Sequence, residues 1–481
     1  MLALDWIGFG SLIALLVFSG LYRSLRTRDE SAYLFASRRT GLFALTATLV
    51  MTEFNPTTLL AFSSVGFFAG WWGLSLPFVF LAGLAFYALV VARHWKRFDG
   101  SSVAELFTLR YGVLLGRTAS AALLLAMAGF SATYIRSLVL IFGPLAPEIG
   151  ELALSVAIVG LVLLITLRGG LLAVIRTDIV SFVAVCLVIP AIVYAIGFAA
   201  PGELADAGAG EAKKISFEAG RAALPPAFVF SLVLLTMFTY ILAPWYGQKI
   251  FAARSEKVAF ASVALSAVIV FALYGAMVAA VYFARLRGLS VENPETALPA
   301  AVQLFAPAGV RGVAYGLFLL AGATTLAGVW NAMTAMLRTD FLGGGVALQS
   351  TKGAAASGES TDPAQKRLRG DIAITGACAA ISLVLANVAI DRVLDKLILA
   401  NIPVAALSFA LLGAFYWPRA SKVGAFASVL VGLAWGVFSY LYFGEAGMYT
   451  WYWVVYGLPA IFAVGIAGSL LWPPVATARE I

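Results

Sequence analysis

The chain has 481 residues, of which 62% are hydrophobic and only 12% are charged, and its mean hydropathy is +0.95. This composition excludes a water-soluble domain with an ordinary polar surface and indicates a protein that lies in lipid. The net charge is +8, but the basic residues form no cluster typical of a nucleic-acid surface. The expected partners are therefore a small-molecule substrate and membrane lipid, with no nucleic acid and no obligatory protein partner.

Apolar segments long enough to cross a bilayer recur along nearly the whole chain. A helix of about 20 residues spans the roughly 30 Å of hydrocarbon, and thirteen segments meet this length or come close to it. The sequence therefore predicts an all-α integral membrane protein with about 13 transmembrane helices. They lie near residues 5–23, 41–69, 71–93, 116–143, 151–167, 171–199, 223–245, 258–285, 307–337, 370–389, 394–416, 421–442 and 450–472.

Lysine and arginine gather in alternate connections between these segments. The connections that would face the cytoplasm hold 23 of the 32 Lys and Arg residues, and they are residues 23–40, 93–117, 168–176, 246–257, 338–369, 417–422 and 473–481. Because positive charge favours the cytoplasmic side, we predict a multi-pass protein of the cell (inner) membrane with its N-terminus outside and its C-terminus in the cytoplasm. Residues 343–369 are rich in Gly, Ala, Ser and Thr and are predicted to form a flexible cytoplasmic loop.

The second apolar segment contains a polar interruption, Thr52-Glu53-Phe54-Asn55-Pro56-Thr57-Thr58. Polar groups in hydrocarbon cost several kcal/mol each, so a carboxylate, an amide and three hydroxyls beside a proline indicate a broken helix that lines a site. This pattern is typical of transporters.

Few residues are suited to metal or redox chemistry. Cys186 and Cys378 lie in apolar segments, where a free cysteine usually serves as a small hydrophobe. His94 is the only histidine, which excludes a multi-histidine metal centre. No nucleophile motif and no phosphate-binding G-x-x-x-x-G-K-[ST] loop occurs, so we do not expect an enzyme or an ATP-driven pump.

Five segments resemble motifs of one transporter family. They are GLYRSLRTRDESAYLFASRRTGLF at 20–43, RGGLLAVIRTD at 168–178, YGQKIFAARSEKVAFAS at 246–262, LAGATTLAGVWNAMTAMLRTD at 320–340 and FYWPRASKVGAFASVLVG at 415–432. In this order they are similar to segments of the sodium/solute symporter family, which includes proline, pantothenate, sugar and sialic acid symporters.

The resemblance implies one transmembrane domain over residues 1–481 with a LeuT-like fold. Its core would be a five-plus-five inverted repeat, residues 41–199 and 223–416, with one extra helix before it (5–23) and two after it (421–472). The break near Glu53 fits the discontinuous first helix of such a repeat. The matching break in the second repeat is less evident, with polar residues at Thr236, Thr239 and Tyr240 and a proline at Pro244.

The resemblance also implies a sodium site between the broken helix and the ninth predicted span. Its ligands would be the backbone carbonyls of Met51, Phe54 and Ala321 and the hydroxyls of Thr324 and Thr325. Sodium is a hard cation that prefers oxygen ligands. The alternative is that the two threonines only bond to carbonyls one turn earlier in their helix.

Some relatives bind a second sodium ion through the aspartate of the TD motif and two further serines. Asp178 is present here, but the matching positions are Ala327 and Gly328, which have no side-chain oxygen. We therefore predict one sodium ion. Asp178 is left with two roles, guiding the cation towards the cytoplasm or pairing with Arg176.

Asn55, Thr58, Glu53, Arg136 and Tyr240 are the candidates for the substrate site. The guanidinium of Arg136, deep in the fourth span, could bind a substrate carboxylate, pair with Glu53 or extend to the outer surface. Glu53 could strengthen the cation site or carry a proton.

The predicted function is sodium-coupled import of a small organic solute by alternating access, with a carboxylate-bearing solute as one option. The alternatives are a proton-coupled symporter of the same fold and a transporter-like sensor. The short tail after Trp472 has no output domain, which argues against the sensor.

Overall fold

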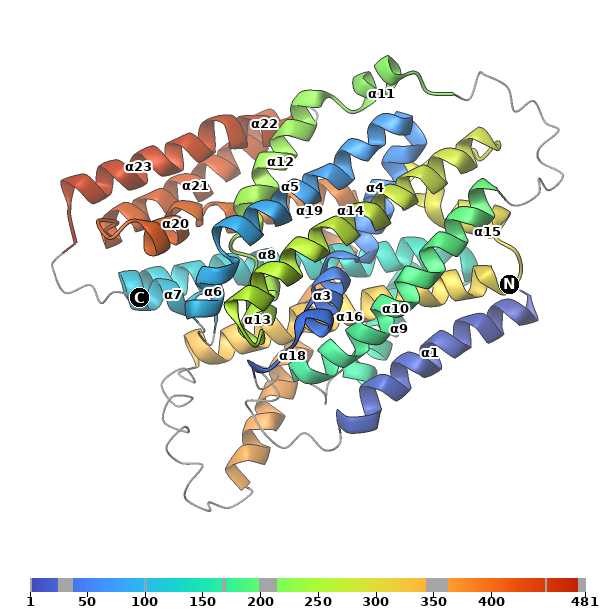
Figure 1. The fold of residues 1–481 in the computed structure, drawn as a ribbon, viewed down its shortest axis with the longest axis horizontal. Coiled ribbons are helices and arrows are strands. Elements are labelled where there is room, and N and C mark those ends of the chain that lie inside the picture. The colour runs from blue at the N-terminus through green and yellow to red at the C-terminus, as the bar shows by residue number, and fades with distance from the viewer. Residues whose placement is uncertain are drawn as a thin grey trace.

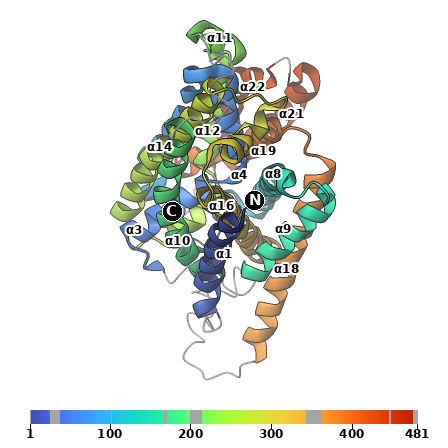
Figure 2. The same ribbon diagram turned by 90° about the vertical axis from the view of Figure 1, so that its right-hand side faces the viewer.

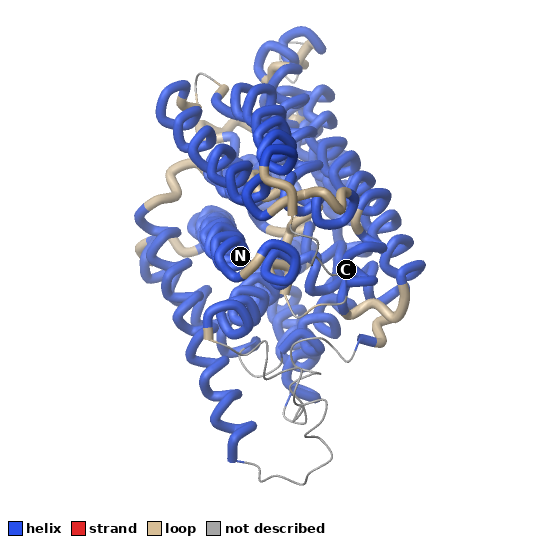
Figure 3. Tube along the Cα trace, turned by 90° about the vertical axis from the view of Figure 1, so that its left-hand side faces the viewer, coloured by secondary structure: helices blue, strands red, loops and turns tan. Residues whose placement is uncertain are grey.

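The computed structural model describes residues 2–24, 38–98, 100, 102–166, 170–198, 214–342, 362–445 and 448–474. Within these residues the regular structure is helical (Figure 3), apart from an isolated bridge between Thr40 and Ala253. Eight helices are long and apolar enough to cross a membrane, and two bent pairs raise this number to ten. Three shorter apolar helices, Ala3–Leu15, Leu42–Glu53 and Glu151–Leu164, accompany them.

The main helices coincide with the predicted apolar segments. They are α1 (Ala3–Ser24), α3 (Leu42–Glu53), α4 (Pro56–Ala69), α5 (Ser75–Val90), α8 (Val113–Phe142), α9 (Glu151–Thr166), α10 (Gly170–Gly197), α12 (Pro226–Tyr240), α14 (Glu256–Leu286), α16 (Val310–Met336), α18 (Asp362–Val388), α19 (Val393–Ala405), α20 (Ser408–Tyr416), α21 (Lys422–Phe443) and α23 (Leu458–Leu471). The shorter helices include α6 (Ala92–Phe98), α7 (Glu105–Tyr111), α11 (Phe217–Ala223), α13 (Pro244–Phe251) and α22 (Tyr449–Tyr452).

Two predicted connections differ from the structure. In the predicted flexible loop 343–369, residues 343–361 lie outside the described residues, and residues 362–369 form the first turns of α18. The predicted cytoplasmic connection 246–257 begins inside α13, whose residues are all buried. Its lysine, Lys249, is therefore part of the protein interior and not of a solvated loop.

Helix α16 forms the centre of the molecule and is buried along most of its length. It contacts α1, α3, α8, α10 and α18, while α21 and α23 pack on each other and lie together at one side (Figure 1). Helix α11 and the beginning of α18 lie at opposite ends of the molecule (Figure 2). The interior around α3, α4 and α16 is thus enclosed by protein on several sides.

The polar interruption predicted from the sequence breaks the second span into α3 and α4. Asn55 is the N-cap of α4, and its side-chain oxygen accepts a hydrogen bond from the amide of Thr58 at 2.9 Å. Pro56 occupies the first helical position, where its missing N–H costs nothing and its fixed φ favours the helix. Asn55 and Pro56 together therefore start a new helix two residues after α3 has ended.

A second break separates α12 from α13 at residues 241–243. Pro244 opens α13, and the freed carbonyl of Ile241 accepts a hydrogen bond from the Trp95 indole at 2.8 Å. The bridge between Thr40 and Ala253 ties the entry of α3 to the exit of α13. The two broken helices are therefore joined at one end.

Candidate functional site

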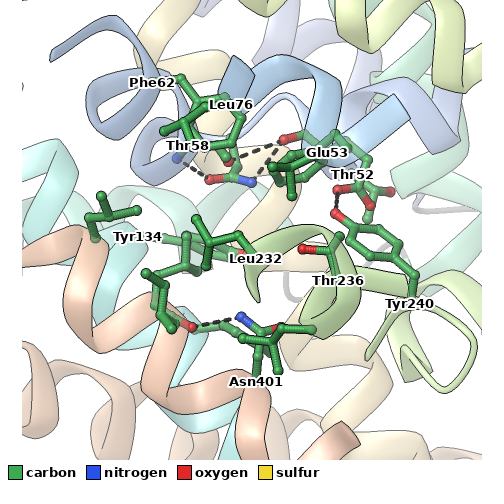
Figure 4. A pocket seen from close by; sticks show the side chains of 18 of the residues that line it. Thr52, Glu53, Thr58, Phe62, Leu76, Tyr134, Leu232, Thr236, Tyr240 and Asn401 are labelled. Carbon is green, nitrogen blue, oxygen red and sulfur yellow. Dashed lines mark hydrogen bonds between the residues drawn. The ribbon is translucent and has the colours of Figure 1, made fainter. Parts of the chain in front are cut away.

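A cavity lies beside the break between α3 and α4 (Figure 4). Its walls are mostly apolar and aromatic, with a few polar side chains from α3, α4, α12 and α19. The polar lining residues are Thr52, Glu53, Asn55, Thr58, Tyr134, Thr236, Tyr240 and Asn401, with Tyr134 on α8. Apolar cavities with a few converging polar groups are typical binding sites for small molecules.

Glu53 is the only charged residue among the described residues that line this cavity. Its side chain is buried, and Oε2 accepts a hydrogen bond from the hydroxyl of Tyr240. The other carboxylate oxygen, Oε1, is buried and has no hydrogen-bond partner within the part of the chain that the structure describes. A buried carboxylate with an unsatisfied oxygen is costly unless a cation or a donor reaches it.

The carbonyl of Glu53 holds the break in shape. It accepts hydrogen bonds from the amide of Asn55 at 2.9 Å, from the Asn55 side chain at 2.8 Å and from the hydroxyl of Tyr274 on α14. The Thr58 hydroxyl donates to the same carbonyl at 3.4 Å. Asn55 and Thr58 thus line the cavity and also fix the backbone around Glu53.

The break also leaves carbonyls at the end of α3 without backbone donors. The amide of Asn55, which would bond to Met51 in a continuous helix, turns to Glu53, and Pro56 has no N–H to offer Thr52. The Phe54 carbonyl likewise accepts no hydrogen bond from any residue in the described ranges. Free carbonyls of this kind are suited to coordinate a cation.

Four of the five predicted sodium ligands lie together where α3 faces α16. The Thr325 hydroxyl is 2.8 Å from the Ala321 carbonyl and 3.2 Å from the Met51 carbonyl. Thr324 bonds to the Ala321 carbonyl at 3.3 Å. Both threonines thus bond to a carbonyl one turn earlier, as the structural alternative predicted, but Thr325 also reaches the broken helix. The Thr325 hydroxyl has a single proton for the carbonyls of Met51 and Ala321. The oxygen atoms of this group therefore keep lone pairs that a cation can use.

One helical turn along α3 from Met51, a buried ion pair joins three helices. Lys249 of α13 lies 2.9 Å from the Asp178 carboxylate of α10, and their side chains are 4% and 1% exposed. The Lys249 ammonium also donates to the carbonyl of Thr48 at 2.9 Å and to the hydroxyl of Thr52. Asp178 accepts a hydrogen bond from the Thr48 hydroxyl, and Thr324 also interacts with it. This pair places a positive charge beside the Thr48 carbonyl of α3 and a negative charge beside Thr324 of α16.

A model of the sodium:solute symporter family matches residues 33–432 of the chain. The chain belongs to the sodium:solute symporter family. The symporter is also similar to a solved structure of a Na⁺-coupled sialic acid symporter in a substrate-bound, outward-open state, with a TM-score of 0.78 and 17% identity over 99% of each chain. At this identity the likeness concerns the fold, which is LeuT-like. A search of curated proteins finds no match.

Family membership confirms that the symporter is a transporter and not an enzyme, and that it is a multi-pass membrane protein. It also confirms sodium-coupled symport as the general activity.

The structure places Arg136 away from the cavity. Its guanidinium pairs with Glu151 at 2.6 Å, and Arg136 does not belong to the cavity lining. Asp178 pairs with Lys249, so the predicted partner Arg176 is replaced by a residue of another helix. Glu53, Asn55, Thr58 and Tyr240, by contrast, are brought together around one space.

Several residues of the symporter's site were not predicted. Lys249 falls in the predicted cytoplasmic connection 246–257. The proline at position 244, near the end of the predicted span 223–245, was the available sign of a second broken helix that continues through Lys249. Tyr274, Asn401 and Trp245 lie in long apolar segments, where a single polar or aromatic residue gives no sign of which helix face it occupies.

Proposed function

We propose that the symporter imports a small organic solute together with one sodium ion by alternating access. The observation that carries this proposal is the oxygen cluster of Met51, Ala321 and Thr325 beside the cavity at the break. We assign Phe54 and Thr324 to the same ion site, Phe54 through its unbonded carbonyl and Thr324 through its hydroxyl.

The break provides a physical reason for coupling. In the segment from Met51 to Thr58, the carbonyls of Met51 and Phe54 are the proposed ion ligands, and that of Met51 faces Thr325 of α16. The side chains of Glu53, Asn55 and Thr58 in the same segment line the cavity. A sodium ion that orders these carbonyls also orders the wall of the solute site, so each ligand strengthens the binding of the other. The membrane potential adds about 2.3 kcal/mol per charge for each 100 mV.

A single sodium ion is supported by the surroundings of Asp178. Its carboxylate already has a buried counter-charge in Lys249. The positions that would complete a second site, Ala327 and Gly328, offer no side-chain oxygen. A second cation next to Lys249 would face a positive charge in a region of low dielectric.

We extend the proposal to the architecture. The thirteen spans would comprise an inverted repeat, residues 41–199 and 223–416, and each repeat opens with one of the two observed breaks. The N-terminus would lie outside the cell membrane and the C-terminus in the cytoplasm, as the distribution of Lys and Arg predicts.

The cavity lining argues against the carboxylate-bearing solute that the sequence left as an option. No arginine, lysine or histidine occurs among the described residues that line the cavity. A carboxylate-bearing solute therefore meets no positively charged side chain in the described lining, since Arg136 is paired with Glu151 outside it. We do not include a carboxylate in the proposal.

Proton coupling is the second candidate, because Oε1 of Glu53 is buried without a partner and could hold a proton. The two candidates differ in the gradient that drives uptake. Proteoliposomes containing the purified protein are tested with an inward sodium, potassium or proton gradient at equal membrane potential, against a panel of small solutes. We expect uptake with sodium alone. Uptake driven by a proton gradient without sodium, and lost in Glu53→Gln, would establish the alternative.

A matched threonine pair tests the ion site in the same assay. Thr325→Ala is expected to raise the sodium concentration for half-maximal uptake by at least about tenfold, which corresponds to about 1.4 kcal/mol. Thr133 of α8 is buried and donates to the carbonyl of Phe130 in its own helix. Thr133→Ala is expected to leave the sodium dependence unchanged.

A further inference from the structure

We propose that the solute carries a cationic nitrogen, so that the symporter transports a small organic ammonium ion that binds Glu53 and the aromatic wall of the cavity. The inference rests on the proposed function, since it names the substrate class of the same site.

Glu53 is the charged residue of the described cavity lining. Glu53 is 2% exposed, Tyr240 satisfies one of its oxygens, and no described residue bonds to the other. Lys249 is already bound to Asp178, Thr52 and Thr48. Among the described residues, the cavity lining therefore contains one acidic group and no basic group, and it favours a ligand that brings the positive charge.

Aromatic side chains form much of the cavity wall. Rings from five helices, α4, α5, α8, α12 and α13, line the space: Phe62, Phe80, Phe130, Tyr134, Tyr240 and Trp245. Several are in mutual contact, with centroid distances of 5.1 Å between Phe62 and Phe80, 5.7 Å between Phe80 and Tyr240, and 4.9 Å between Phe130 and Trp245. Aromatic faces attract ammonium groups through their quadrupoles, and more strongly where water is excluded.

Two neutral polar side chains lie in the cavity lining besides those of the break and the tyrosines. Thr236 of α12 and Asn401 of α19 are neutral and come from helices other than the one that carries Glu53 (Figure 4). They suit a hydroxyl or amide at the other end of the solute. A carboxylate group there would lack a positive side chain, so the recognition favours a cation over an anion or a zwitterion.

The test uses purified protein in detergent with sodium present. Three ammonium ions, choline, ethanolamine and putrescine, are each titrated by calorimetry against a neutral carbon analogue of the same shape, with lactate and glucose as further probes. We expect at least one ammonium ion to bind at least about tenfold more tightly than its neutral analogue. Binding of lactate, glucose or a neutral analogue in preference to every ammonium ion, or no binding by any ammonium ion, would overturn the inference.

Two variants locate the interaction. Glu53→Gln keeps the size of the side chain and is expected to abolish the preference for the cation, whereas Glu256→Gln makes the same change in an exposed partner of Arg97 and should not. Phe80→Leu serves if Glu53→Gln does not fold, and it should weaken the cation more than the neutral analogue. An unchanged preference in both cavity variants would contradict the assignment.

Failure of this inference and failure of sodium coupling are distinguishable. Uptake of an ammonium ion without dependence on sodium would refute sodium coupling and leave the substrate class standing. Sodium-driven uptake restricted to neutral or anionic solutes would refute the substrate class and leave sodium symport standing.

Discussion

Lys249 and Asp178 form an ion pair that is almost completely removed from water. Each charge is stabilised by the other and by the hydrogen bonds from Thr48 and to Thr52. A buried charge that loses its partner is more costly than no charge at all. The pair is therefore expected to lock α13 to α10 and α3 as long as both members are present.

A double substitution measures this pair. Lys249→Met alone is expected to destabilise the protein by roughly 3–5 kcal/mol, because it leaves the Asp178 carboxylate buried without compensation. Lys249→Met with Asp178→Leu should recover most of that loss. Thermal unfolding in detergent reports both values, and Arg97→Gln, which breaks an exposed pair with Glu256, should cost at most about 1 kcal/mol. Additive effects of the two buried substitutions would disprove the pairing energy.

At the same scale, the sequence predicted only part of the site. The threonines of α16 and the polar residues of the break were recognised because hydroxyls and a carboxylate are rare in apolar helices. Lys249 was misplaced because a lysine at the end of an apolar segment usually marks a solvated loop. Its burial depends on Asp178, which is 71 positions away in the sequence, and only the folded chain brings the two together.

The packing of α4 on α14 depends on a glycine. A Cβ atom on Gly66 would lie 2.2 Å from the carbonyl oxygen of Val278, so the two backbones approach too closely for any side chain. On α9, by contrast, a Cβ atom on Gly160 would meet nothing within 4 Å. The two positions therefore provide a matched pair for testing whether this contact positions the broken helix.

We expect Gly66→Ala to destabilise the protein by about 1–3 kcal/mol through overpacking. Gly160→Ala should be neutral or stabilise it by up to about 1 kcal/mol, because alanine favours a helix. The readouts are the thermal unfolding temperature in detergent and solute uptake. Equal effects of the two substitutions would show that the close approach of α4 and α14 has no importance for stability.

Helix positions were largely predictable, and one of the two breaks was. Asn55 followed by Pro56 has the chemistry of an N-cap and a first helical residue, so the first interruption was evident. The break at residues 241–243 contains only Ile, Leu and Ala. The carbonyl of Ile241 accepts a hydrogen bond from Trp95 of another helix. Nothing local distinguishes such a break from a continuous span except Pro244, which follows it.

The whole molecule has an expected orientation in the membrane that labelling can test. In a background with Cys186→Ala and Cys378→Ala, Glu218→Cys and Lys257→Cys introduce single thiols at exposed positions of α11 and α14. With the N-terminus outside, a membrane-impermeant maleimide should label Glu218→Cys in intact cells and Lys257→Cys only after lysis. The reverse pattern would invert the proposed topology.

The overall class of the protein followed from composition, since 62% hydrophobic residues require lipid as the solvent. The family followed from motifs dispersed over the chain, and the match over residues 33–432 confirms it. The substrate class was not predictable in this way. It depends on which side chains of α3, α4, α5, α8, α12, α13 and α19 face one cavity, and on the pairing of Arg136 outside it.

Equilibrium binding of radioactive sodium to the purified protein in detergent tests the proposed sodium site directly, because it requires no knowledge of the solute. We expect a single saturable sodium ion per chain in the wild type, at least about tenfold weaker binding in Thr325→Ala and unchanged binding in Thr133→Ala. Absence of saturable sodium binding in the wild type, or equal binding in Thr325→Ala, would contradict a sodium site between the broken helix and α16.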